Sequence, residues 1–267
     1  MRAHARLATA HVPTPHGGRS IVSDLHSEVP LQLRLTHAKG PEPGADQTAM
    51  PARVCIAAGA AGPVGGDRLR LDVLVGAGST LILSDISATV LLPGPDGERS
   101  VTRTRIRVEA GGTLIWTPEP VIAARGSDHT NEITIDLADG ARLFVRDELL
   151  LGRHAEKPGT VRQHVRVEYA GRPLYHQDLE LGTHARGWPS PAMTDSHRAI
   201  GSVLIVDPTE GHASPTARAL TDGLAVLPLS GPGTLISAVA SNILDLREDL
   251  DAAMRALGPP SPRAQGK

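Results

Sequence analysis

The segment spanning residues 65–94 constrains the fold more than any other part of the chain. It opens on a Gly-Gly-Asp turn that ends at Asp67, and it contains two apolar-rich runs separated by a second turn, Gly-Ala-Gly at 76–78. In the first run, residues 68–75, apolar and polar side chains alternate, which is typical of a strand with one buried face. The second run, residues 80–92, is more continuously apolar and predicts a strand covered on both faces. We therefore expect a β-hairpin that forms part of a rigid scaffold.

Strand patterns recur through the middle of the chain. The predicted strands are residues 101–108, 113–116, 132–137, 142–151, 161–169 and 174–181. Glycine-containing turns separate them, and Asp139-Gly140 is typical of a hairpin turn because glycine adopts positive φ without a Cβ clash. The sequence thus predicts a mainly β protein.

Helical patterns are confined to the C-terminal part. Residues 216–222 follow Ser214-Pro215 and precede Gly223, which predicts a short helix with a capping serine, a proline at its first position and a closing glycine. A second helix is predicted to start at Ser241 or Asn242, because apolar residues recur at helical spacing from Ile243 onward. We expect one domain over residues 1–257 and a disordered tail at 258–267.

Composition excludes several classes of protein. The net charge of -2 gives no general attraction to nucleic acid or to an anionic membrane. No apolar run approaches the roughly 20 residues of a membrane span, and the N-terminal segment lacks the apolar core of a secretion signal. The single cysteine, Cys55, excludes an internal disulfide and is expected in the core. These features predict a cytoplasmic protein that binds neither nucleic acid nor membrane.

Potential metal and anion sites are weak. The glycine-rich residues 59–67 end in Asp67 rather than in the Gly-Lys-Ser/Thr of a phosphate loop, so a structural turn is favoured. The twelve histidines lack metal-ligand spacing, although His164 and His176 lie on strands that could be adjacent. Arg103, Arg105 and Arg107 share one face of a strand, which indicates an exposed face or a charged protein contact.

The acidic pair Asp147-Glu148 is the most suggestive chemical feature. Strand alternation sends the two carboxylates to opposite faces, so they cannot work as a paired acid and base. An inward Asp147 needs compensation. Either it is ion-paired with Arg153 or Arg142, or it lines a water-filled internal path. No catalytic constellation emerges from the residues.

Four motifs, in order, resemble the UreD/UreH family of urease accessory proteins. They are VGGDRL at residues 64–69, SDISAT at 84–89 in place of the usual TTQAAT-like run, LIWTPEPVIAARGS at 114–127, and RDELLLGR at 146–153. The resemblance implies stacked, β-helix-like sheets with a few short helices. It also implies a protein that is not an enzyme and has no tightly bound cofactor.

The same resemblance implies partners and site residues. A UreF-type protein would bind the chain, a UreG-type GTPase would join it, and the complex would dock on the structural subunits of apo-urease and deliver Ni²⁺ transiently through an internal channel. Asp67 and Asp147 match family acids associated with that channel or its stability, Arg153 matches the family arginine, and Ser87 lies near a position linked to the path; these four residues are the predicted nickel path. Weak metal candidates are Asp67, Asp147, His164 and His176. Oxygen-rich contacts hold nickel loosely, which suits transit better than storage.

Two other functions stay open on the residues alone. One is a β-sheet hydrolase or isomerase in which Asp147 is the acid and His164 or His176 is the base. The other is an interaction module unrelated to nickel.

Overall fold

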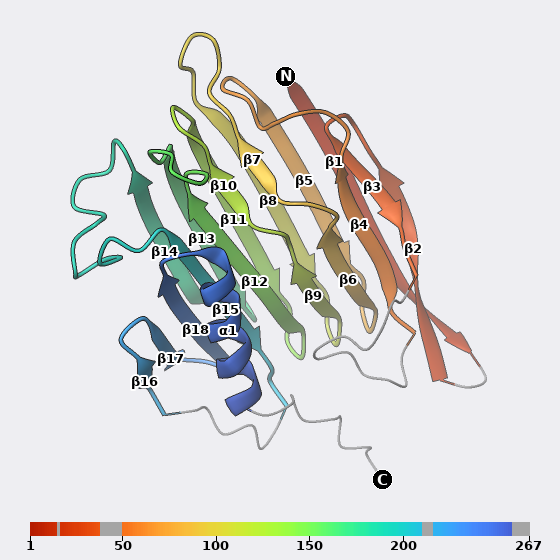
Figure 1. The fold of residues 1–267 in the computed structure, drawn as a ribbon. Helices are drawn as coiled ribbons and strands as arrows, with labels where there is room; N and C mark the ends of the chain where they lie inside the picture. The colour runs from red at the N-terminus through yellow and green to blue at the C-terminus, as the bar shows by residue number, and fades with distance from the viewer. Residues whose placement is uncertain (15–16, 38–49, 210–215, 258–267) are drawn as a thin grey trace.

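Two large β-sheets pack face to face, and a helix near the C-terminus covers part of one of them (Figure 1). The computed structural model describes residues 1–14, 17–37, 50–209 and 216–257. The seven-stranded sheet has the order β14 (Arg172–Gly182), β13 (Thr160–Tyr169), β11 (Asp128–Leu137), β8 (Ser100–Val108), β5 (Arg68–Val75), β1 (Arg2–Thr14), β2 (Gly17–His26). The eleven-stranded sheet has the order β16 (Arg218–Thr221), β17 (Leu224–Pro228), β18 (Gly233–Ala240), β15 (Ala199–Val206), β12 (Arg142–Leu151), β9 (Thr113–Thr117), β6 (Thr80–Asp85), β4 (Ala52–Ala58), β3 (Leu31–Leu35), and it also contains β7 (Thr89–Leu91) and β10 (Val121–Ala123).

The chain passes back and forth between the sheets as stacked coils. In the seven-stranded sheet β5, β8, β11 and β13 are neighbours with parallel pairing, and in the other sheet β6, β9 and β12 are also parallel. Each parallel neighbour comes from the preceding or following coil, as in a β-solenoid. The prediction of a mainly β protein with stacked, β-helix-like sheets is confirmed.

Both predicted hairpin turns are wrong in their connectivity. The turn at Gly78 joins β5 to β6, and the turn at Gly140 joins β11 to β12, so each turn carries the chain from one sheet to the other. The two glycines do have positive φ, 65° and 71°. A hairpin turn and a turn between two sheets need the same local conformation. The two are distinguished by strand pairing, which here is made with strands from the neighbouring coils.

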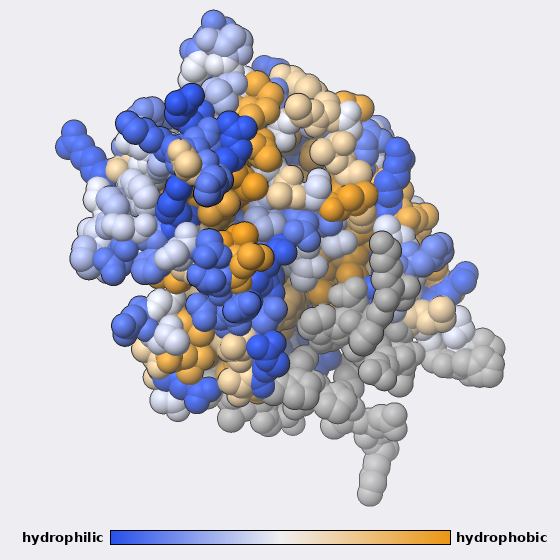
Figure 2. Space-filling model, in the orientation of Figure 1, coloured by the Kyte–Doolittle hydropathy of each residue, from blue (hydrophilic) through white to orange (hydrophobic). Residues whose placement is uncertain are grey.

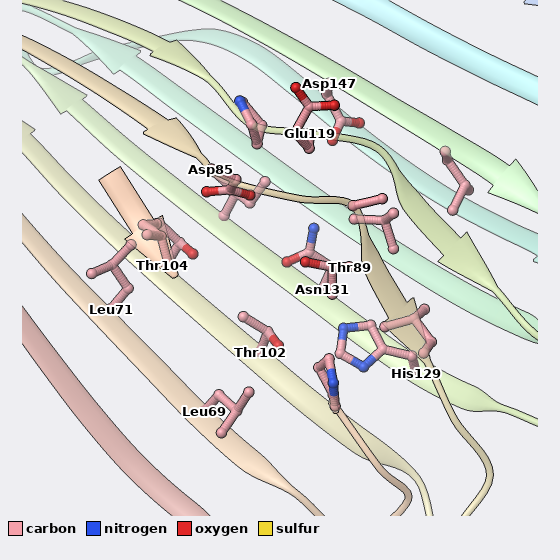
Figure 3. A pocket seen from close by; sticks show the side chains of 18 of the residues that line it. Leu69, Leu71, Asp85, Thr89, Thr102, Thr104, Glu119, His129, Asn131 and Asp147 are labelled. Atoms are coloured by element: carbon pink, nitrogen blue, oxygen red, sulfur yellow. The ribbon is translucent and has the colours of Figure 1, made fainter. Parts of the chain in front are cut away.

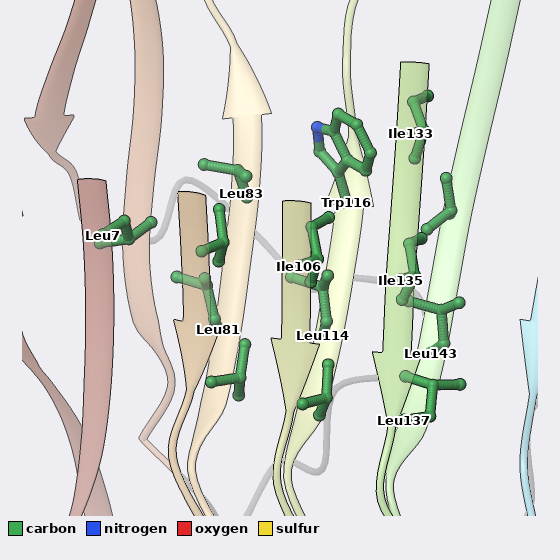
Figure 4. Close-up of a cluster of buried hydrophobic side chains, with 14 of the residues drawn as sticks. Leu7, Leu81, Leu83, Ile106, Leu114, Trp116, Ile133, Ile135, Leu137 and Leu143 are labelled. Carbon is green, nitrogen blue, oxygen red and sulfur yellow. The ribbon is translucent and has the colours of Figure 1, made fainter. Parts of the chain in front are cut away.

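The core fills the space between the sheets with aliphatic side chains (Figure 4). The predicted alternation of β5 is confirmed, because Leu69, Leu71, Val73 and Val75 are all buried. β6 is covered on both faces as predicted, since three successive residues, Leu81–Leu83, are at most 4% exposed. Cys55 is also buried.

The described residues of the C-terminal part contain one helix rather than two. Helix α1 (Ile243–Leu257) begins where predicted, with Asn242 Oδ1 accepting hydrogen bonds from the amides of Leu244 and Asp245. Its buried residues Leu246, Leu250 and Ala253 pack on the outer face of the eleven-stranded sheet at β15 and β18. No helix in the described residues is long and apolar enough to cross a membrane.

The predicted helix at residues 216–222 is wrong. Residues 218–221 form strand β16, which pairs with β17 as a hairpin. The residues taken for a helix stop, Asp222-Gly223, are the turn of that hairpin, and the sheet edge supplies the backbone partners that a helix would have made. The proposed capping residues Ser214 and Pro215, and the tail at 258–267, lie outside the described residues.

Candidate functional site: a cavity between the sheets

A cavity of about 180 Å³ lies between the two sheets near the ends of the core strands. One wall is formed by inward side chains of β5, β8, β11 and β13, and the other by β6, β9 and β12 with the segments around Ser87 and Glu119. Figure 3 shows Asp85, Glu119 and Asp147 toward one end of this space and His129 toward the other. A space of this size holds several water molecules.

Asp147 faces the cavity from β12. Its Oδ2 accepts a hydrogen bond of 2.5 Å from the side-chain amide of Gln163 on β13, across the gap between the sheets. Burial raises the pKa of the Asp147 carboxyl, the charge of Glu148 raises it further, and the Gln163 hydrogen bond opposes both. The predicted ion pairs are wrong: Arg142 pairs with Asp207, and Arg153 pairs with Glu156.

The neighbouring Glu148 points to the opposite face of β12, as strand alternation predicts. Its side chain is 0% exposed and lies under α1, where it accepts hydrogen bonds from Arg146 at 2.5 Å and Arg247 at 2.8 Å. The two adjacent acids therefore have unrelated roles: one faces the cavity and the other anchors the helix.

Asp85 and Glu119 bring two further carboxyl groups to the cavity. Asp85 ends β6, and its Oδ1 is buried without a hydrogen-bond partner among the described residues. Burial raises the pKa of Asp85 to about 7, with a contribution from the negative charge of Glu119, while the Glu119 backbone amide acts in the opposite direction. Near pH 7, the protonated and ionised forms of Asp85 are therefore both populated.

His129 supplies a neutral polar group at the other end of the cavity. Its Nδ1 is 2.8 Å from Ser100 Oγ. Burial lowers the pKa of His129 to about 4, so the imidazole is uncharged at pH 7. The indole N–H of Trp116, which also lines the cavity, is buried and has no hydrogen-bond partner among the described residues.

The four residues predicted for a nickel path are divided by the structure. Ser87 and Asp147 line the cavity. Asp67 is not among the lining residues but is buried beside them: its Oδ1 lies 2.6 Å from the amino nitrogen of Met1, and its Oδ2 accepts a 2.9 Å hydrogen bond from the Val64 amide. Arg153 is exposed and makes an ion pair of 2.8 Å with Glu156.

Asp67→Asn is expected to lower the free energy of unfolding by about 1–2 kcal/mol. The substitution removes the charge that faces the Met1 amine and places an amide N–H where an acceptor is needed. Urea denaturation of the two proteins measures the difference. An unchanged midpoint would contradict a structural role for this carboxylate.

The histidine candidates lie on the outer face of the seven-stranded sheet. β13 and β14 are adjacent, as predicted, and Asp178 Oδ1 is 2.5 Å from His164 Nδ1 while Asp178 Oδ2 is 3.4 Å from His176 Nε2. These groups are exposed, whereas Asp147 faces the interior. The acid and base of the hydrolase interpretation are therefore not brought together. Within the described residues, no three His, Cys, Asp or Glu side chains are grouped so that they could hold a metal ion.

Three cavity residues were missed by sequence reasoning, namely Asp85, Glu119 and His129. Asp85 follows the apolar residues Leu81–Leu83. An ionisable side chain so close to buried positions indicates a carboxyl group that is itself partly buried, and this pattern could have identified Asp85 as a candidate. Glu119 and His129 lie among polar or proline residues and carry no comparable signal.

Comparison with known sequences assigns the chain to a family. The sequence profile described as "UreD urease accessory protein" matches residues 1–265. The chain belongs to the UreD family. Urease accessory protein UreD 2 of Saccharopolyspora erythraea is 39% identical over 258 residues, which cover 94% of this chain and 88% of that protein. UreD of Streptomyces coelicolor is 37% identical over 241 residues, covering 90% and 91%, and UreD of Frankia alni is 38% identical over 277 residues, covering 94% and 92%. The resemblance found in the four motifs is thus confirmed over nearly the whole chain.

Proposed function

We propose that this UreD-family protein is a non-enzymatic cytoplasmic scaffold for urease maturation. In this proposal it holds UreF-type and UreG-type accessory proteins on the structural subunits of apo-urease, and Ni²⁺ crosses it transiently through the cavity between the sheets. The observation that carries the second part is the placement of Asp147: its carboxyl group faces an internal space lined mainly by apolar side chains, where it accepts a hydrogen bond from the neutral side chain of Gln163. Isolated oxygen ligands bind Ni²⁺ weakly enough for it to leave again.

Exposed apolar side chains support the scaffold part of the proposal. Leu35, Met50, Ile86 and Leu244 are each 64–69% exposed. Figure 2 shows hydrophobic areas between hydrophilic ones on the face that carries α1. Large apolar side chains on a surface favour burial against partner proteins.

Asp147→Asn is expected to lower the nickel content of co-expressed urease about tenfold. The substitution keeps the shape of the side chain but removes the carboxyl group that can release its proton and bind Ni²⁺ as a carboxylate, and a contact of this kind contributes about 1.5 kcal/mol. The measurement is nickel per urease active site, determined on urease purified from cells that express the whole accessory set.

Asp136→Asn is the matched control, because Asp136 lies on the exposed face of β11. It should leave the nickel content unchanged, and both variants should co-purify with the UreF-type partner. Wild-type nickel content in the Asp147→Asn sample would contradict passage through the cavity. If the partner and urease were not recovered with the wild-type chain, an interaction module unrelated to nickel would be favoured.

A further inference from the structure

A continuous series of charged contacts joins helix α1 to the wall of the cavity. Arg247, on the sheet-facing side of α1, donates from Nε to Glu148 Oε2 and from Nη2 to Glu119 Oε2, both at 2.8 Å. Arg146 of β12 donates from Nε to the other oxygen of Glu148 and from Nη1 to Asp251 of α1 at 2.6 Å. Two arginines and three acids thus fasten the helix to the sheet.

Glu119 is the point at which this network reaches the cavity. It lies between two prolines in the segment that connects β9 to β10, and it is a lining residue of the cavity. The carbonyl of Pro120 accepts a hydrogen bond of 3.0 Å from the Thr89 amide, which holds the segment beside β7. One face of Glu119 therefore meets Arg247, and the other meets the cavity and Asp85 (Figure 3).

We propose that Arg247 is a positioning residue through which α1 holds Glu119 in the cavity wall, so that the seating of the helix controls the charge at this end of the cavity. With the helix seated, the guanidinium neutralises Glu119. With the helix displaced, Glu119 is unpaired next to Asp85 and Asp147, and this end of the cavity attracts cations more strongly. The link to cation passage rests on the function proposed above, whereas the link between Arg247 and the cavity acids does not.

Few charged groups surround Asp85, so the effect of Arg247 on the pKa of Asp85 is measurable. They are Glu119 from the β9–β10 connection, Asp147 and Arg146 from β12, His129 from β11, and Arg247 behind Glu119. His129 is neutral near pH 7, and Arg146 is engaged by Glu148 and Asp251. Loss of Arg247 removes a guanidinium from both Glu119 and Glu148. Because Glu148 keeps Arg146 and lies on the opposite face of β12, Asp85 senses mainly the change at Glu119.

The experiment is a carboxyl-carbon NMR titration of the isolated full chain without metal. In Arg247→Gln the pKa of Asp85 should rise by roughly one pH unit, because the charge of Glu119 is no longer compensated. Arg247→Lys should restore most of the wild-type value. Arg255→Gln, on the exposed face of the last turn of α1, should leave it unchanged.

A double-mutant cycle distinguishes positioning from a general loosening of the structure. In a Glu119→Gln background, the further change Arg247→Gln should shift the Asp85 titration little, since the group that carries the effect is absent. An equal shift with and without Glu119, or no shift in Arg247→Gln alone, would overturn the proposal. Because nickel and urease are absent from this measurement, its failure is separate from a failure of Asp147→Asn to alter nickel loading.

Discussion

Glu148→Gln is expected to lower the free energy of unfolding by about 3 kcal/mol. Glu148 has a fully buried side chain and accepts hydrogen bonds from both Arg146 and Arg247. Removing the charged partner of a buried ion pair typically costs about 3–5 kcal/mol, because the remaining charge is left uncompensated in a poorly solvated place. The lower end applies here, since Arg146 keeps Asp251 and Arg247 keeps Glu119.

Chemical denaturation followed by circular dichroism measures this change as a shift in midpoint at constant slope. Glu248→Gln is the matched control, because Glu248 lies on the exposed side of the same helix and should change stability by less than about 0.5 kcal/mol. If the two variants were equally stable, the ion pairs under α1 would not anchor the helix.

Asp85→Asn is expected to stabilise the protein at pH 8 by about 3–4 kcal/mol, and to have little effect on its stability at pH 4. The pKa of Asp85 is raised to about 7 in the folded protein, mainly by burial, from an ordinary value of 3.8. Between these values the unfolded chain has released the proton while the folded chain retains it, so ionisation of Asp85 destabilises the fold progressively as pH rises. At about 1.4 kcal/mol per pH unit, the full penalty above pH 7 is about 4 kcal/mol.

The quantity to measure is the difference in unfolding free energy between Asp85→Asn and the wild type from pH 4 to pH 8. It should increase with pH and level off above 7. The same difference for Asp136→Asn, whose carboxylate is exposed, should stay nearly flat. A flat difference for Asp85→Asn as well would show that Asp85 ionises like a solvated carboxylate.

The alternation of buried and exposed side chains along single strands could be predicted from the sequence because it depends on local geometry. The inward positions of β5 and the division of Asp147 from Glu148 follow from the period of two in any strand. The start of α1 could be predicted for a similar reason, since the capping residue Asn242 is followed within a few residues by apolar side chains at helical spacing. The predictions of strand alternation and of the start of α1, which used only neighbouring residues, were therefore confirmed.

Predictions that required a pairing partner were less successful. Arg142 and Arg153 were candidate partners for Asp147 because they are near in sequence, yet the contact is made by Gln163 from the facing sheet. Residues 216–222 were predicted to be a helix from a capping serine, a proline and the closing Gly223. Asp222-Gly223 also suits a hairpin turn, and pairing of β16 with β17 decided between the two. Asp85 and Glu119 become neighbours only when β6 and the β9–β10 connection are stacked.

The sequence by itself determined the β class of this UreD-family chain, the buried face of its strands, the position of its C-terminal helix and, through four ordered motifs, its family. Only the tertiary structure decided which sheet each strand joins, that Asp147 faces a cavity containing two other acids, and that α1 is tied to that cavity by Arg247. The physical reason is range: strand alternation and helix capping are set by bonds between near neighbours, whereas parallel coils and buried charges depend on residues brought together from distant parts of the chain.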